Sequence, residues 1–287
     1  MASRYLEDCL GKRIIFFTGK GGVGKGTLAW ATALSCAHQK AKVRLVQWNP
    51  LESVSSIAKE ESSDISFHTL ETLQCFKEYA LQILKFKTIY HAVFDNHVLQ
   101  TFIRAAPGLS ETVIAGKVWD LYNQKEQDLL IVDLPASGHA VSFFQSPLGV
   151  SHLFRVGWVH REAEKICQMF SDPNVRLDLV TIPEELPVTE CKELKEKLST
   201  LHPFHFGFIH LNQCLPKFSV PPAEILHRFP SEVRQCYFRH EERSKQEKTL
   251  YPVITGLGLP ILETPKMAGS KGAWEVIEQV ANHLETL

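Results

Sequence analysis

The nine residues from Gly19 to Thr27 constrain the fold of this chain more than any other stretch. They read Gly-Lys-Gly-Gly-Val-Gly-Lys-Gly-Thr. An apolar run typical of a buried strand, Ile14–Phe17, precedes them, and the Ala-rich segment Leu28–Ala37 that follows predicts a helix. Glycines let the backbone turn consecutive N–H groups toward one point, and the N-terminus of a helix adds positive potential there. The pattern therefore predicts a phosphate-binding loop between a strand and a helix.

Two lysines and one glycine qualify this prediction. Lys25 stands where a P-loop lysine supplies charge to the terminal phosphates, and Lys20 near the start of the loop marks the deviant form of the Walker A motif. The next position usually carries Ser or Thr as a magnesium ligand, but here it is Gly26. We expect the loop to hold phosphates through Gly19, Lys20, Gly21, Gly22, Val23, Gly24, Lys25, Gly26 and Thr27.

The bulk properties indicate a globular intracellular protein. With 287 residues the chain fits a single large α/β unit spanning 1–287, and 31 basic against 32 acidic residues give no field that would attract nucleic acid. No apolar run approaches the ~20 residues needed to cross a bilayer, so we expect no direct membrane insertion. Acidic residues near the N-terminus argue against an export signal, which predicts a cytoplasmic location. The seven cysteines form no CxxC pair and are expected to be buried free thiols.

The remaining pattern predicts a doubly wound, mostly parallel sheet flanked by helices. Further strands are expected at 43–48, 129–133, 177–182, 205–212 and 259–263, with helices at 189–198 and at the C-terminus. Residues 51–127 have a mostly helical period and are predicted to form a helical insertion in the sheet. Within it, Lys85 and Lys87 flank Phe86, either as a solvated face or as a patch for something acidic.

Asp133 ends the apolar run Leu129–Asp133, which has the form of a central parallel strand buried on both sides. Ligands of open α/β sheets bind at the carboxyl edge of the strands, so we expect Asp133 to face the same site as the loop. The C-terminal helix has one apolar stripe containing Trp274 and Ile277, and its other side is acidic. It is expected to pack on the sheet and not on anionic lipid.

Several separated segments together resemble the ArsA family, which includes the arsenite-pump ATPases and the tail-anchored-protein-targeting ATPases. The segments are 19–27, 49–50, 106–111, 133–139, 182–185 and 212–213. The resemblance spans nearly the whole chain and implies ATP or ADP as the ligand. It also implies that Lys20 contacts nucleotide across a dimer, that Asp133 belongs to the second switch near Mg²⁺, continued by Gly138 and His139, and that Asn212 recognises adenine.

Departures from the family pattern concentrate in the catalytic centre. Asn49 stands at the usual position of the aspartate that places the attacking water, Ser56 at a second acid of the first switch, and Gly26 at the magnesium ligand. Losing a positioned base costs on the order of 10²–10⁴-fold in rate. The segment between Ser146 and Arg176 lacks the long methionine-rich insertion of the targeting branch, and the chain has three methionines, so no client is indicated.

The leading hypothesis is an ArsA-like, adenine-nucleotide-binding, dimer-forming protein with weak or absent ATP hydrolysis. Lys20, Lys25 and Asp133 are its candidate catalytic positions, and Asp133 its candidate Mg²⁺ ligand. The dimer is a homodimer or a heterodimer with an intact ArsA-family paralogue, for which Lys20 completes the site. The alternatives are an active Mg²⁺-dependent ATPase that energises transport or targeting of a client, and a small-molecule kinase or ligase of the same P-loop group.

Overall fold

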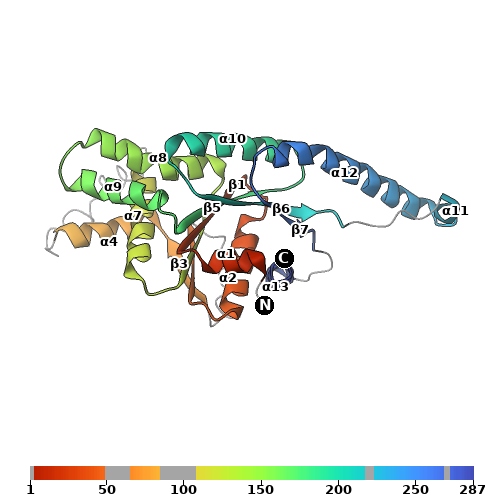
Figure 1. Cartoon of the computed structure of the whole chain (residues 1–287), viewed down its shortest axis with the longest axis horizontal. Coiled ribbons are helices and arrows are strands. Elements are labelled where there is room, and N and C mark those ends of the chain that lie inside the picture. Colours follow the sequence, from red (N-terminus) through yellow and green to blue (C-terminus); the bar gives the residue numbers. More distant parts are fainter. Residues whose placement is uncertain (1–2, 49–64, 85–107, 217–222, 268–271) are drawn as a thin grey trace.

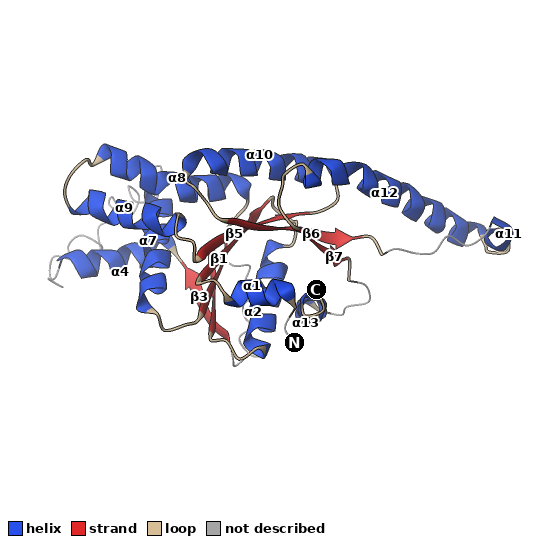
Figure 2. Ribbon diagram, viewed as in Figure 1, coloured by secondary structure: helices blue, strands red, loops and turns tan. Residues whose placement is uncertain are grey.

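A parallel sheet lies at the centre of the molecule, with helices on both faces (Figures 1 and 2). The computed structural model describes residues 3–48, 65–84, 108–216, 223–267 and 272–287. The strand order is β3-β2-β4-β1-β5-β6-β7, and every neighbouring pair runs parallel. The bounds are β1 Ile14–Gly19, β2 Val43–Trp48, β3 Ile65–Leu70, β4 Leu129–Asp133, β5 Val175–Thr181, β6 Phe206–Cys214 and β7 Ile261–Pro265. The doubly wound α/β prediction is confirmed.

Alternation along β1 explains why this strand occupies the middle of the sheet. Ile14 and Phe16 pack into the core on one face, whereas Ile15 and Phe17 pack into the core on the other. All four side chains are at most 1% exposed. Because successive side chains of a strand point to opposite faces, such a run is stable only with helices on both sides. The loop that follows Gly19 therefore emerges at the centre of the carboxyl edge.

The helices divide between the two faces of the sheet. One core contains side chains of α1, α2 and α13, and the other contains side chains of α7, α8, α9 and α10. The Ser3 hydroxyl donates to the Leu284 carbonyl oxygen at 2.7 Å, which ties the start of the chain to its last helix. The bounds are α1 Arg4–Leu10, α2 Lys25–His38, α4 Thr72–Leu84, α7 Leu109–Gln124, α8 Ser137–Leu153, α9 Trp158–Phe170, α10 Glu185–Leu201, α11 Ala223–Leu226, α12 Ser231–Thr255 and α13 Ala273–Leu284.

The expectation of a mostly helical stretch over 51–127 is wrong at residues 65–70. These residues form β3, which pairs in parallel with β2 from Val43↔Ile65 to Trp48↔Leu70 and lies at the end of the strand order. The segment reads Ile-Ser-Phe-His-Thr-Leu, and this alternation of apolar and polar residues suits a strand at the sheet edge. The described helices of this stretch are α4 and α7. The patch at 85–87 lies outside the described residues.

The C-terminal helix packs as expected, since Ile277, Ala281 and Leu284 of α13 are buried in the core that contains α2. Helix α12 instead runs away from the sheet toward α11, and Ile254 is its only buried residue (Figure 1). Among the described residues, no helix combines the length and hydrophobicity needed to cross a bilayer. The cysteines are free, but Cys236 is exposed and Cys167 is half-buried, so the expectation of burial holds for the other five.

Candidate functional site

The loop after β1 is built on glycines that other residues cannot replace without strain. Gly24 caps α2 with φ = 89°, and Gly22 has φ = 84°, both in the left-handed region. A Cβ atom at Gly19 would lie 2.1 Å from the Val180 carbonyl oxygen. The first hydrogen bond of α2 runs from Leu28 N to the Gly24 oxygen at 3.0 Å, so the N–H groups of 25–27 have no partner inside the helix. This arrangement is a backbone cradle for an anion.

The two loop lysines lie in different surroundings. Lys25 is 9% exposed, and its Nζ donates to the Lys20 carbonyl oxygen at 2.9 Å, so its stem follows the loop. The Lys20 ammonium instead pairs with Glu190 of α10 at 2.9 Å, with about a third of the Glu190 side chain exposed. Lys25 is therefore held inside the cradle, and Lys20 lies on the side of α10.

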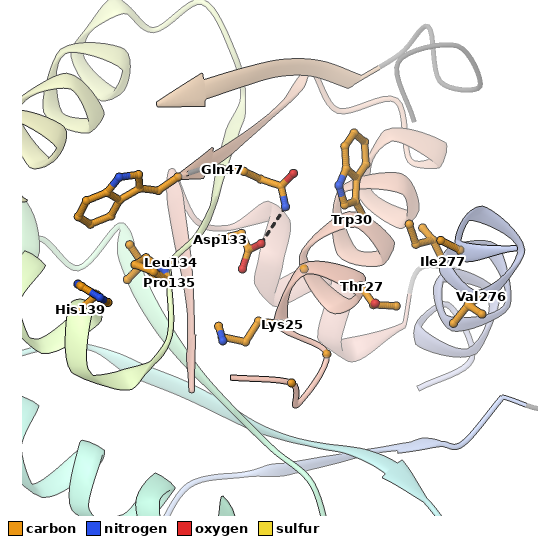
Figure 3. Close-up of a pocket in the computed structure, with 15 residues that line it drawn as sticks. Lys25, Thr27, Trp30, Gln47, Asp133, Leu134, Pro135, His139, Val276 and Ile277 are labelled. Atoms are coloured by element: carbon orange, nitrogen blue, oxygen red, sulfur yellow. Dashed lines mark hydrogen bonds between the residues drawn. The ribbon is translucent and has the colours of Figure 1, made fainter. Parts of the chain in front are cut away.

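Asp133 lies beside the cradle, at the end of β4. The parallel register aligns it with Phe17 on one side and Gln47 on the other. The Gln47 amide donates from Nε2 to Asp133 Oδ2 at 2.8 Å, as the dashed line in Figure 3 marks. A Cβ atom at Gly26 would lie 3.1 Å from the same Oδ2 atom. The carboxylate predicted at the strand edge thus faces the start of α2.

Burial alters the acid–base properties of these groups. Burial raises the pKa of Asp133 to about 6, although the Gln47 hydrogen bond and the Lys25 charge oppose the shift. Burial also lowers the pKa of Lys25, against the attraction of the Asp133 carboxylate. Each group is less costly to bury in the presence of the other, and a bound phosphate would stabilise the charged form of Lys25.

A pocket of about 600 Å³ opens beside the loop (Figure 3). Its walls combine the start of α2 with the ends of β2 and β4, the start of α8 and one face of α13. Trp30 and Trp48 make two of these walls apolar, while Lys25 and Asp133 are its charged side chains. The exposed His139 also lines it, so the second-switch segment predicted from the sequence borders the same space. Its size and mixed lining suit a small ligand that carries phosphate.

Asn212 lies against the phosphate loop. It is 5% exposed, and its Nδ2 donates to the Val23 carbonyl oxygen at 2.8 Å. A Cβ atom at Gly24 would lie 2.2 Å from this nitrogen, so the close approach requires glycine. The amide thus supports the loop, and adenine recognition by Asn212 stays a prediction. Asn49 and Ser56 lie outside the described residues.

Phosphoryl transfer on P-loops normally uses Mg²⁺ held by the loop Ser or Thr and an acidic residue. Gly26 provides no side-chain oxygen, and Asp133 is the only acidic residue among the described residues that line the pocket. One of its oxygens already accepts the Gln47 hydrogen bond. Among all the residues that the structure describes, no three His, Cys, Asp or Glu side chains group closely enough to hold a metal ion. These side chains do not fit a magnesium site.

Sequence reasoning missed two residues that contact the predicted ones, Gln47 and Glu190. Gln47 is a polar residue in the otherwise apolar end of β2, where it is buried. A buried amide needs a hydrogen-bond partner, so a glutamine in such a strand was a usable signal of a polar contact. Glu190 is one of many acidic residues on α10, and nothing in the sequence distinguishes it. Trp30, which lines the pocket, was also missed. It lies in the apolar helix α2, where a buried tryptophan is expected from core packing alone.

The parallel sheet, the glycine loop between β1 and α2, and the buried Lys25 define the P-loop class of nucleotide-binding proteins. Residues 12–159 match the family model described as anion-transporting ATPase. The chain belongs to this ArsA ATPase family, and family membership supports nucleotide binding.

Three relatives illustrate the similarity. ATPase BagA of Mycobacterium tuberculosis is 26% identical over 72% of this chain and 66% of its own length. The arsenical pump-driving ATPase of Escherichia coli is 25% identical over 71% of this chain and 40% of its own length. The ATPase ASNA1 homolog of Plasmodium vivax is 21% identical over 78% of this chain and 61% of its own length. In each case the alignment covers less than two thirds of the relative.

Proposed function

We propose that this chain binds ATP or ADP at its phosphate loop and closes as a dimer around the nucleotide, with slow or absent ATP hydrolysis. It acts as a regulatory or partner subunit, either with a second copy or with an intact paralogue of the family. One observation carries the proposal: the anion cradle and Lys25 are in place, while position 26 has no side-chain oxygen beside Asp133. Nucleotide binding needs the cradle and the lysine, whereas metal-assisted hydrolysis normally needs the side-chain oxygen that position 26 lacks.

The ion pair of Lys20 with Glu190 is compatible with a role for Lys20 in a dimer. Exposed pairs of this kind are worth about 0.2–1 kcal/mol, so little energy holds Lys20 on its own chain. In a dimer, Lys20 would give up its ion pair with the Glu190 carboxylate and contact several phosphate oxygens of the partner's nucleotide instead. Lys20 is therefore the residue through which a subunit with little hydrolysis of its own would act on another.

Lys20→Met is expected to abolish the ATP-dependent association of the chain with itself or with an intact family ATPase. Glu190→Gln is expected to change that association by no more than about fivefold, because about 1 kcal/mol is at stake. Sedimentation velocity with and without ATP measures the association, and phosphate release from the mixture measures the effect on the paralogue. Absence of both association and a Lys20-dependent rise in the paralogue's ATPase rate would refute the dimer proposal.

A second candidate is an active ATPase that drives transport or targeting. Its ATPase activity is favoured by the names of the relatives, one of which is a pump-driving ATPase. It requires residues other than Gly26 to hold the metal and position water. Under this alternative, Asp133→Ala would abolish steady phosphate release by the chain alone. Under our proposal phosphate release by the chain alone is absent or far slower than that of an intact family ATPase.

A further inference from the structure

The side chain of Gln47 occupies the region beside Asp133 and Gly26, where a P-loop protein usually holds its magnesium ion. It is 7% exposed and comes from β2, the strand directly next to Asp133 in the sheet. The Gln47 amide nitrogen lies 2.8 Å from Asp133 Oδ2. Polar contact with this carboxylate is therefore made by the protein itself.

The chemistry of the two groups sets the direction of this hydrogen bond. An ionised carboxylate only accepts, so the amide must present its N–H₂ group to Asp133. In Figure 3 the amide nitrogen lies on the side of Asp133 and the amide oxygen on the side of Trp30. The group facing the carboxylate thus carries partial positive charge, as a cation would, and offers no lone pair to a metal.

Gly26 and Gln47 fit together sterically. A Cβ atom at Gly26 would lie 3.1 Å from Asp133 Oδ2 and 3.6 Å from Gln47 Nε2. The first distance is tighter than an ordinary contact and the second is an ordinary one, so a serine or threonine here would press on the Asp133 carboxylate. The absence of a side chain at 26 therefore spares the Asp133 carboxylate a close contact on the side where it accepts the Gln47 hydrogen bond. The two residues act together to replace one metal ligand with one hydrogen-bond donor.

We infer that the Gln47 amide substitutes for magnesium at Asp133, so that this site binds a nucleoside di- or triphosphate free of divalent cation. The inference rests on the proposed function, because it concerns how the same site holds its nucleotide. A cation entering the site would have to displace a charge-assisted hydrogen bond and would find no oxygen at position 26. The phosphate charge is instead met by Lys25 and by the N–H groups at the start of α2.

The wild-type chain provides the first test without any substitution. ATP is titrated calorimetrically into the full chain in excess MgCl₂ and, separately, in excess EDTA. We expect dissociation constants that agree within about twofold, which is within about 0.4 kcal/mol. Binding that is at least ~tenfold tighter with Mg²⁺ overturns the inference and leaves nucleotide binding intact. Absence of binding in both buffers overturns the proposed function as well, so the two failures are distinguishable.

Gln47→Glu provides the second test, because it replaces the amide donor with a carboxylate against Asp133. Two adjacent carboxylates require a cation or a proton, so ATP binding should become at least ~tenfold weaker in EDTA than in MgCl₂. Gln124→Glu is the matched control, since Gln124 donates to Asp120 Oδ2 at 3.0 Å on the exposed part of α7. We expect the control to bind ATP equally in both buffers. A Gln47→Glu chain that folds and remains insensitive to Mg²⁺ contradicts the role of Gln47.

Discussion

Lys25→Met is expected to weaken ATP binding by about 10- to 100-fold, because it removes the one buried cation of the phosphate cradle. Lys25 is 9% exposed, and its ammonium lies next to the loop backbone, where a phosphate would replace water around it. A hydrogen bond to a charged group contributes about 1.5–3 kcal/mol, and each 1.4 kcal/mol is about tenfold in affinity. Calorimetric titration of the full chain measures the change, and methionine preserves most of the side-chain volume.

Lys20→Met is the matched control for this prediction. Its ammonium pairs with Glu190 in the single chain, so its loss should change the affinity of one chain for ATP less than the loss of Lys25 does. The comparison is made at a protein concentration where the chain is monomeric, since a dimer role of Lys20 would otherwise contribute. Equal losses from the two substitutions would show that Lys25 has no special place in the cradle.

Asp178→Ala is expected to destabilise the folded chain by about 3–5 kcal/mol, because it removes the buried carboxylate partner of Arg176 and leaves this arginine with the half-exposed Asp8 carboxylate. Asp178 is fully buried, and Arg176, 2% exposed, donates to it from Nη2 at 2.8 Å. His210 Nε2 lies 3.2 Å from the same carboxylate oxygen, and the Phe208 N–H donates to the other oxygen at 3.0 Å. Urea denaturation followed by circular dichroism measures the free energy of unfolding.

Glu193→Ala is the surface control, since it breaks the exposed Lys197–Glu193 pair of α10 and should cost less than about 1 kcal/mol. The acid limb of stability is a second readout. Burial alone would raise the pKa of Asp178, but Arg176 and His210 hold it below the ordinary value. The stabilisation is therefore complete above about pH 4 and lost as the pH falls through the lowered pKa, a loss that Asp178→Ala should remove. A cost for Asp178→Ala no larger than that of the control would contradict the prediction.

The position of the site could be predicted from the sequence because it depends on strand ends. The apolar runs before Gly19 and up to Asp133 indicate central strands, and parallel strands bring their carboxyl ends to one edge. The glycine pattern indicates the loop between β1 and α2, where the left-handed φ angles of Gly22 and Gly24 leave few alternatives. These inferences need only local patterns and the rule for parallel sheets.

The residues that change the interpretation depend on pairings that the sequence does not state. Gln47 reaches Asp133 because β2 lies next to β4, although the two strands are about 80 residues apart in the chain. The edge strand β3 is hard to predict because it has only six residues and some of them are polar. Likewise, Arg176 and Asp178 are buried in β5 because Gly207 of the neighbouring strand leaves space for them, since a Cβ there would lie 2.2 Å from Asp178 Oδ1.

The most direct measurement of the central claim combines binding and turnover on one sample. ATP is titrated into the full chain by calorimetry, and phosphate release is then followed from the same saturated sample beside the Lys25→Met variant. The account predicts saturable binding that Lys25→Met weakens, with phosphate release from the wild-type chain that is absent or far slower than that of an intact family ATPase assayed alongside. Phosphate release from the wild-type chain at a rate like that of the intact ATPase, abolished by Lys25→Met, would contradict it, because the site would then efficiently hydrolyse the nucleotide it holds.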